Sequence, residues 1–150
     1  MRRIQHNNGL SRRQFLKAST LAATAFTIVP GHVLGLNGAT PSSERVRIAG
    51  IGIGGQGGHD LGQFRGLPVD VVALCDVDWD RGAGSFNSFP KAKKYKDYRK
   101  MLEEMDKEID AVIVATPDHT HAPASITAIR RGKHVYCEKP LTHTMFEAKW

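Results

Sequence analysis

Three glycines at fixed spacing follow a short apolar segment and could hold the diphosphate of a dinucleotide. Gly52, Gly54 and Gly57 make a G-x-G-x-x-G pattern. In this pattern the first glycine allows a tight turn, the second lets a pyrophosphate approach the backbone, and the third lets a helix pack closely on a strand. Asp76 follows at roughly the 20-residue offset at which a carboxylate reaches the adenosine ribose. Since that carboxylate would repel a 2′-phosphate, the pattern predicts NAD over NADP; the alternative is an ordinary solvated loop aspartate.

Two later segments carry further polar residues that could contact a cofactor. The first, residues 115–121, reads A-T-P-D-H-T-H and includes Thr116 and Pro117; the second is E-K-P at residues 138–140. Each comes directly after an apolar run, and ligands bind at the carboxyl ends of strands in open α/β sheets. The two histidines of the first segment would point different ways from one helix start, so we predict no metal site from them.

The elements that must position these residues alternate between strand and helix patterns. Apolar runs predict strands at 46–53, 69–74, 91–95, 109–115 and 133–137, and helical patterns occupy 59–64, 97–105 and 119–131. Residues 80–90 are rich in glycine and predict a short helix or loop at best, while residues 141–150 begin a helical pattern. The fold class is therefore α/β, with a doubly wound parallel sheet of the Rossmann type that lacks its last strand.

Helix 97–105 presents an apolar face that we expect in the core, formed by Tyr98, Met101, Leu102 and Met105. The two cysteines, Cys75 and Cys137, are expected at the ends of neighbouring strands. We predict separate buried thiols rather than a disulfide, because parallel strand ends rarely supply the geometry that a disulfide requires.

The charge of the chain is concentrated in its first part. The net charge is +6, and residues 1–40 contribute five basic residues and no acidic one, which leaves +1 for residues 41–150. A net charge of this size would otherwise suggest a nucleic-acid partner. With the charge divided in this way, we predict no nucleic-acid partner for the domain at 41–150.

Residues 1–40 have the pattern of a targeting segment. Ser11 to Lys17 reads S-R-R-Q-F-L-K, which matches the twin-arginine export motif, and a mildly apolar run too short for a membrane span follows it. We therefore predict export to the periplasm or a similar compartment; a basic amphipathic helix or an uncleaved anchor is the alternative. No good cleavage site is visible, so cleavage of the segment stays open.

Taken together, the glycine pattern, Asp76, the A-T-P segment and E-K-P resemble the N-terminal domain of the Gfo/Idh/MocA oxidoreductases over about residues 45–150. The resemblance implies that Lys139 is the catalytic residue beside the nicotinamide. It also implies that Glu138 and His121 lie at the nicotinamide ribose. Hydride transfer from an alcohol needs a group that takes the hydroxyl proton, and a lysine can do this. The expected cofactor contacts are Gly52, Gly54, Gly57, Asp76, Thr116, Pro117, His121 and Glu138.

The resemblance also implies a longer parent protein. Family members continue into a second α+β domain that supplies the substrate pocket and further catalytic residues, so residues 1–150 alone are expected to be inactive, and the parent protein is expected to be a homo-oligomer. An exported enzyme meets almost no free NAD, so we expect the cofactor to be tightly held.

Three functions stay open at this point. The first is an NAD-dependent oxidoreductase that acts on a hydroxyl of a sugar or cyclitol substrate. The second is a redox-neutral glycosidase that oxidises a sugar carbon transiently and then returns the hydride. The third is a nucleotide-binding protein without turnover, against which an intact E-K-P argues.

Overall fold

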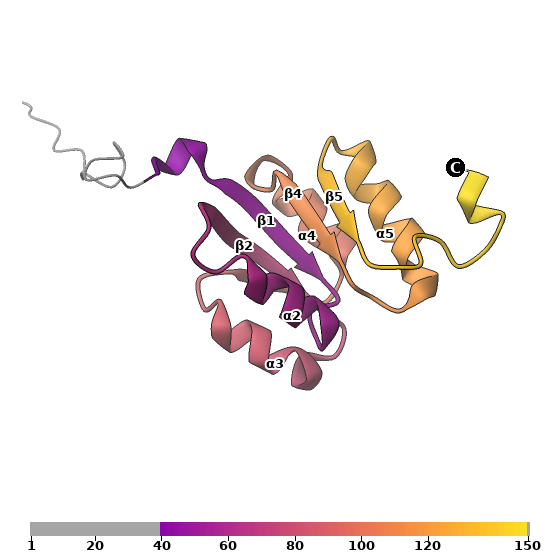
Figure 1. Ribbon diagram of the computed structural model, residues 1–150, viewed down its shortest axis with the longest axis horizontal. Coiled ribbons are helices and arrows are strands. Elements are labelled where there is room, and N and C mark those ends of the chain that lie inside the picture. The colour runs from indigo at the N-terminus through magenta and orange to yellow at the C-terminus, as the bar shows by residue number, and fades with distance from the viewer. Residues whose placement is uncertain (1–39, 150) are drawn as a thin grey trace, which may run out of the picture.

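Five short segments pair side by side into one parallel sheet, as the sequence predicts (Figure 1). The computed structural model describes residues 40–149. The strands are β1 (Val46–Ile51), β2 (Val69–Cys75), β3 (Lys93–Tyr95), β4 (Ala111–Val114) and β5 (His134–Cys137). Their order across the sheet is β3-β2-β1-β4-β5. Because β1 is central and the order reverses there, the carboxyl ends of β1, β2 and β4 frame a crevice at a switch point of the topology.

Helices cover both faces of this sheet (Figure 1). Helices α2 (Gln56–Gln63) and α3 (Trp79–Ser88) lie on one face, while α4 (Tyr98–Glu104) and α5 (Asp118–Arg130) lie on the other. Side chains alternate along β1, so Ile48 packs in the core of the first face and Ala49 in that of the second. The predicted apolar face of the 97–105 helix is confirmed, because its members are all buried, namely Tyr98, Met101, Leu102 and Met105.

Helix α3 is longer and more regular than the sequence predicts. The segment 80–90 is a short helix or loop at best by its composition, yet an α-helix runs from Trp79 to Ser88. The side chain of Asp78 caps it by accepting a hydrogen bond from the backbone N–H of Arg81. Phe86 is buried against the sheet and meets Trp79 edge to face, with ring centroids 5.5 Å apart. Capping and aromatic packing therefore outweigh the low helix propensity of two glycines.

The C-terminal residues also differ from the prediction. Instead of an α-helix over 141–150, the described part holds only a single 3₁₀ turn, Glu147–Lys149. The hydroxyl oxygen of Thr144 accepts a hydrogen bond from the backbone N–H of Glu147, and the Glu147 carboxylate accepts one from the N–H of Thr144. These two reciprocal hydrogen bonds close a tight turn at this point of the chain.

The cysteines are both free thiols, as predicted, but their strands are not neighbours, because β1 and β4 lie between β2 and β5. Cys75 is buried at the end of β2, and burial raises the pKa of its thiol to about 12. Cys137 is half-buried, and burial also raises the pKa of its thiol. Neither thiol is therefore a thiolate at neutral pH.

At the amino ends of the strands, two arginines tie β1 to both of its neighbours. Arg45 pairs with Asp70 on β2 at 2.8 Å, and Arg47 pairs with Asp110, just before β4, at 2.6 Å. The Arg47 guanidinium and backbone N–H both donate to the Asp110 carboxylate, which lowers the pKa of that carboxyl. These ion pairs lie at the end of the sheet opposite the crevice.

The predicted targeting motif, Ser11 to Lys17, lies wholly outside the described residues, because the description begins at residue 40. Between residues 40 and 149, no helix combines the length and apolar character needed to cross a bilayer.

Candidate cofactor-binding site

The turn after β1 is too crowded at Gly52 and Gly57 for either residue to carry a side chain. Gly52 has φ +78°, and a Cβ there would lie 2.7 Å from the backbone nitrogen of Thr116. A Cβ on Gly57 would lie 2.2 Å from the carbonyl oxygen of Gly52. The first and third glycines of the pattern therefore let α2 start directly against the turn, with the chain after β4 packed behind it, as the sequence predicts.

Helix α2 presents free backbone donors to the crevice. It begins at Gln56 after Gly55, which has φ +114°, and no side chain caps its first turn. Its first turn also carries no acidic residue. The unpaired N–H groups and the positive end of the helix dipole are the arrangement that binds a pyrophosphate.

Asp76 lies where the sequence places it, at the end of β2 and against the glycine turn. Its Oδ2 accepts a hydrogen bond of 2.8 Å from the backbone N–H of Gly54, and its Oδ1 accepts one of 3.0 Å from the N–H of Asp78. These bonds fix the carboxylate beside the turn and leave each oxygen a further lone pair with which to accept from ribose hydroxyls.

Arg81 is a site residue that the motifs do not reveal. Its Nε donates a hydrogen bond of 3.0 Å to the carbonyl oxygen of Gly54, so the arginine of α3 lies over the glycine turn. A Cβ on Gly54 would lie 2.7 Å from the Cγ of Arg81, which is a second reason for glycine at this position. The Gly54 residue is thus held on both sides, by Asp76 at its N–H and by Arg81 at its carbonyl.

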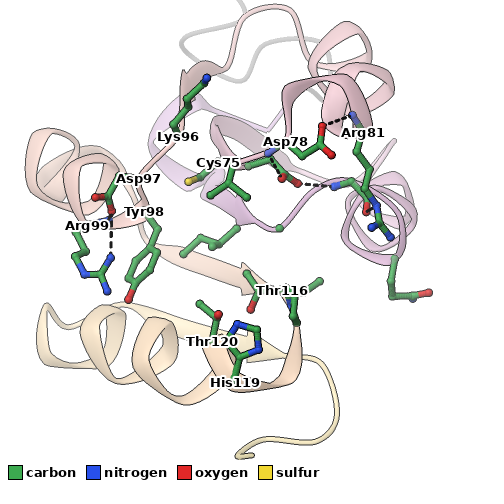
Figure 2. Close-up of a pocket in the computed structure, with 18 residues that line it drawn as sticks. Cys75, Asp78, Arg81, Lys96, Asp97, Tyr98, Arg99, Thr116, His119 and Thr120 are labelled. Carbon is green, nitrogen blue, oxygen red and sulfur yellow. Dashed lines mark hydrogen bonds and ion pairs between the residues drawn. The ribbon is translucent and has the colours of Figure 1, made fainter.

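A cleft of about 770 Å³ opens at these strand ends (Figure 2). Asp78 and Arg81 lie on one side of it, Lys96 to Arg99 on another, and Thr116, His119 and Thr120 at the start of α5. Five of the predicted cofactor residues line this cleft, namely Gly52, Gly54, Asp76, Thr116 and Pro117. The hydroxyl oxygen of Thr116 is buried and has no partner within residues 40–149, so it is available to a ligand at this point.

Gly57 lies at the start of α2, and the remaining predicted residues lie around the turn after β5, beside the cleft rather than on its lining. Glu138 is half-buried and its Oε1 accepts a hydrogen bond of 3.0 Å from the Tyr136 hydroxyl, which raises the pKa of that phenol. Lys139 is exposed, and the bond between Lys139 and Pro140 is cis. His121 is buried under this turn, with an exposed fraction of 1%.

Metal ligands do not come together in the described part of the chain. Between residues 40 and 149 there is no group of three or more His, Cys, Asp or Glu side chains placed to hold an ion. His119 lines the cleft, whereas His121 is buried in the core. The two imidazole rings at the start of α5 therefore point in different directions.

Residues 45–150 match the model of the GFO_IDH_MocA family, described as an oxidoreductase family with an NAD-binding Rossmann fold. The chain belongs to the Gfo/Idh/MocA family. This domain is therefore an NAD-binding Rossmann domain, and the resemblance of its motifs to the family is confirmed.

Relatives of two kinds are similar to the chain. Glycosyl hydrolase family 109 protein 1 of Shewanella sp. (strain ANA-3) is 34% identical, over 95% of this chain and 36% of the relative. Inositol 2-dehydrogenase of Salmonella typhimurium is 33% identical, over 63% of this chain and 28% of the relative. The chain thus spans about a third of the length of the curated relatives that it matches.

The solved structures agree with the fold. Myo-inositol dehydrogenase from Lactobacillus casei, in complex with NAD(H) and myo-inositol, superposes with a TM-score of 0.64 at 30% identity. The superposition covers 70% of this chain and 31% of that one.

The observed site fits NAD on its own geometry. The turn leaves no room for a Cβ at Gly52 or Gly57, α2 begins without a side-chain cap, and a fixed carboxylate lies at the end of β2. Gly52, Gly54 and α2 would hold the pyrophosphate, and Asp76 would accept hydrogen bonds from the adenosine ribose. Thr116 adds a buried hydroxyl on the opposite wall.

Proposed function

We propose that the whole protein of which this domain is part transfers a hydride between NAD and a hydroxyl-bearing carbon of a sugar or cyclitol. The observation that carries this proposal is that the glycine turn after β1 and the E-K-P turn after β5 lie at the same edge of the sheet, where the strands have their carboxyl ends. The backbone N–H of Glu138 donates to the carbonyl of Val114, so the turn after β5 starts beside the cleft. An ionisable side chain, Lys139, therefore stands next to a nucleotide site.

The reaction divides between the cofactor and the chain. Bound NAD supplies the acceptor for the hydride. The amine of Lys139 takes the proton from the substrate hydroxyl oxygen, and the carbonyl bond forms as the C–H bond breaks and its hydride passes to the cofactor. Glu138, next to it, would accept hydrogen bonds at the nicotinamide ribose. The similarity to the dehydrogenases that bear inositol in their names supports a cyclitol or sugar as the class of substrate.

A second function has its own support. The similarity to the Shewanella glycosyl hydrolase covers 95% of this chain, which is more than residues 45–150 can supply, so it extends into the N-terminal segment. A redox-neutral glycosidase would oxidise a sugar carbon, eliminate the aglycone and return the same hydride. Such an enzyme needs no external NAD pool.

We propose in addition that the protein is exported. The S-R-R-Q-F-L-K motif at Ser11 to Lys17 supports twin-arginine export of the folded protein, and an exported enzyme would have to retain its NAD. Replacement of Arg12 and Arg13 by lysine should keep the protein in the cytoplasm. Unchanged periplasmic accumulation of this variant in cell fractions would exclude the twin-arginine route.

The function is tested on the full-length protein with two assays in parallel. NAD reduction is followed by absorbance with myo-inositol, scyllo-inositol and glucose, and hydrolysis is followed with an aryl α-N-acetylgalactosaminide. Reduction of NAD without hydrolysis supports the dehydrogenase, and hydrolysis without net reduction supports the glycosidase. Lys139→Ala should lower the kcat for NAD reduction by about 10²–10⁴ while NAD affinity stays unchanged. A near-normal kcat in that variant would remove Lys139 from the chemistry.

A further inference from the structure

A histidine that does not line the cleft is connected to the turn that carries Lys139. His121 lies in the second turn of α5 with an exposed fraction of 1%. Its Nδ1 is 2.7 Å from the carbonyl oxygen of Pro140. A carbonyl oxygen can only accept, so Nδ1 carries the hydrogen and donates it. The ring therefore holds the backbone on the C-terminal side of Lys139.

The same histidine leaves its other nitrogen without a partner. The second ring nitrogen, Nε2, is buried with no hydrogen-bond partner among residues 40–149. An apolar side chain of similar size would fill this space without leaving a buried nitrogen unpaired. Packing alone thus gives no reason for a histidine here, whereas the bond to Pro140 does.

The turn itself has few other restraints. On the N-terminal side of Lys139, the N–H of Glu138 donates 2.9 Å to the carbonyl of Val114. Between residues 139 and 142, no backbone–backbone hydrogen bond joins the turn to any other described residue. Lys139 therefore stands between two anchors, the sheet at Glu138 and the His121 ring at Pro140.

We propose that His121 is a positioning residue, whose hydrogen bond to the Pro140 carbonyl fixes the turn and so directs Lys139 toward the reacting hydroxyl. This inference rests on the proposed proton transfer by Lys139. It gives His121 a role through the protein backbone, distinct from a contact with the nicotinamide ribose. Misplacement of a catalytic group by about 1 Å can lower the rate about 10²-fold. Loss of a single hydrogen bond that holds the backbone beside Lys139 can therefore lower kcat measurably.

The first test measures the turn directly and needs no substrate. Hydrogen exchange of the Glu138 amide, the one amide of the described turn residues 138–142 that is hydrogen-bonded to the sheet, is compared in the full-length protein and its His121 variants. His121→Asn keeps an N–H donor near the place of Nδ1, whereas His121→Leu removes the donor and keeps the volume. We expect exchange in His121→Leu to be at least 10-fold faster and exchange in His121→Asn to stay near wild type. His134→Leu, at the exposed start of β5, is the matched control. Unchanged exchange in His121→Leu would overturn the proposal; if this variant does not fold, His121→Gln, whose donor sits at the Nε2 position, replaces it.

The second test is a double-mutant cycle on turnover. His121→Leu alone should lower kcat by about 10–100-fold with the Kd for NAD within twofold of wild type, and His121→Asn should restore most of it. In the Lys139→Ala background the same His121 change should have little further effect, because the group that it positions is absent. An equal fold-loss in both backgrounds would overturn the role of His121 while leaving Lys139 in place. A normal kcat for Lys139→Ala would instead overturn the proposed proton transfer by Lys139, on which the role of His121 rests.

Discussion

The carboxylate of Asp76 and the backbone N–H of Gly54 are joined by a hydrogen bond of 2.8 Å. This bond ties the residue that would bind the adenosine ribose to the turn that would bind the pyrophosphate. The two halves of the nucleotide site are therefore coupled. Loss of the Asp76 carboxylate would also remove a hydrogen bond that holds the glycine turn.

Asp76→Ala should weaken NAD binding by about 1–2 kcal/mol, through the loss of charge-assisted hydrogen bonds. NADP binding should change less, since the carboxylate that repels a 2′-phosphate is gone as well. Isothermal titration of the full-length protein with both cofactors measures the two affinities. Tighter binding of NADP than NAD to the wild-type protein would exclude Asp76 as the ribose-binding residue.

Two glycines of helix α2 give a matched pair for the packing of the turn. A Cβ on Gly57 meets the Gly52 carbonyl oxygen at 2.2 Å, whereas a Cβ on Gly62 meets nothing within 4 Å. Gly57→Ala should lower the free energy of unfolding by about 1–3 kcal/mol. It should also weaken NAD binding by shifting the turn.

Gly62→Ala is the control for that comparison. It should raise the free energy of unfolding by about 0.5–1 kcal/mol, because alanine has the higher helix propensity. Denaturant unfolding of the full-length variants, with and without NAD, measures both effects. Similar stability and NAD affinity in the two variants would show that Gly57 is not under the constraint described.

The ion pair between Arg47 and Asp110 predicts how the stability depends on pH. The lowered pKa of the Asp110 carboxyl means that its contribution is present above its unfolded-state pKa of about 3.9 and is lost as the pH falls through the lower, folded-state value. Both side chains are well exposed, at 40% and 38%, so screening by water limits the contribution to about 1 kcal/mol or less.

Asp110→Asn should therefore be less stable than wild type at pH 7 and should converge with it below about pH 4. Thermal unfolding across this range measures the difference. A gap that stays constant down to pH 2 would mean that the pair does not titrate as described.

The cysteines should differ in reactivity. Burial raises the pKa of the Cys75 thiol to about 12, and this thiol is 3% exposed, so alkylation by iodoacetamide at pH 8 should leave it unmodified in the native protein. Cys137 is half-buried and should react slowly. Peptide mass spectrometry after timed alkylation separates the two, and equal rates would contradict the burial of Cys75.

Much of the fold could be predicted because its signals are local. The apolar strand before Gly52 and the near-continuous apolar run of β4 are each recognisable from a few consecutive residues. Helix α3 could not be predicted in full, because its stability depends on the packing of Phe86 against the sheet and of Trp79 against Phe86. Such tertiary contacts are not encoded in the local pattern of residues 80–90, whose glycines favour a loop.

The site divides in the same way. Spacing predicts the residues of the glycine turn and Asp76, since their chemistry requires fixed offsets along the chain. Arg81 could not be found from a motif, because its contact with Gly54 crosses 27 residues and follows from the way α3 docks. The motif position of His121 predicts a contact near the ribose, but only the structure shows its bond to Pro140.

The place of β1 in the middle of the sheet has a consequence for the order of folding. Strand β2 follows β1 closely in the chain, whereas Arg47 and Asp110, which join β1 to the start of β4, are 63 residues apart. Closing the longer loop costs more entropy, so we expect β1, α2 and β2 to assemble before β4 arrives. The crowding of Gly52 against Thr116 exists only after that arrival. We therefore expect the nucleotide site to be completed last, so that NAD binds only after β4 has joined the sheet.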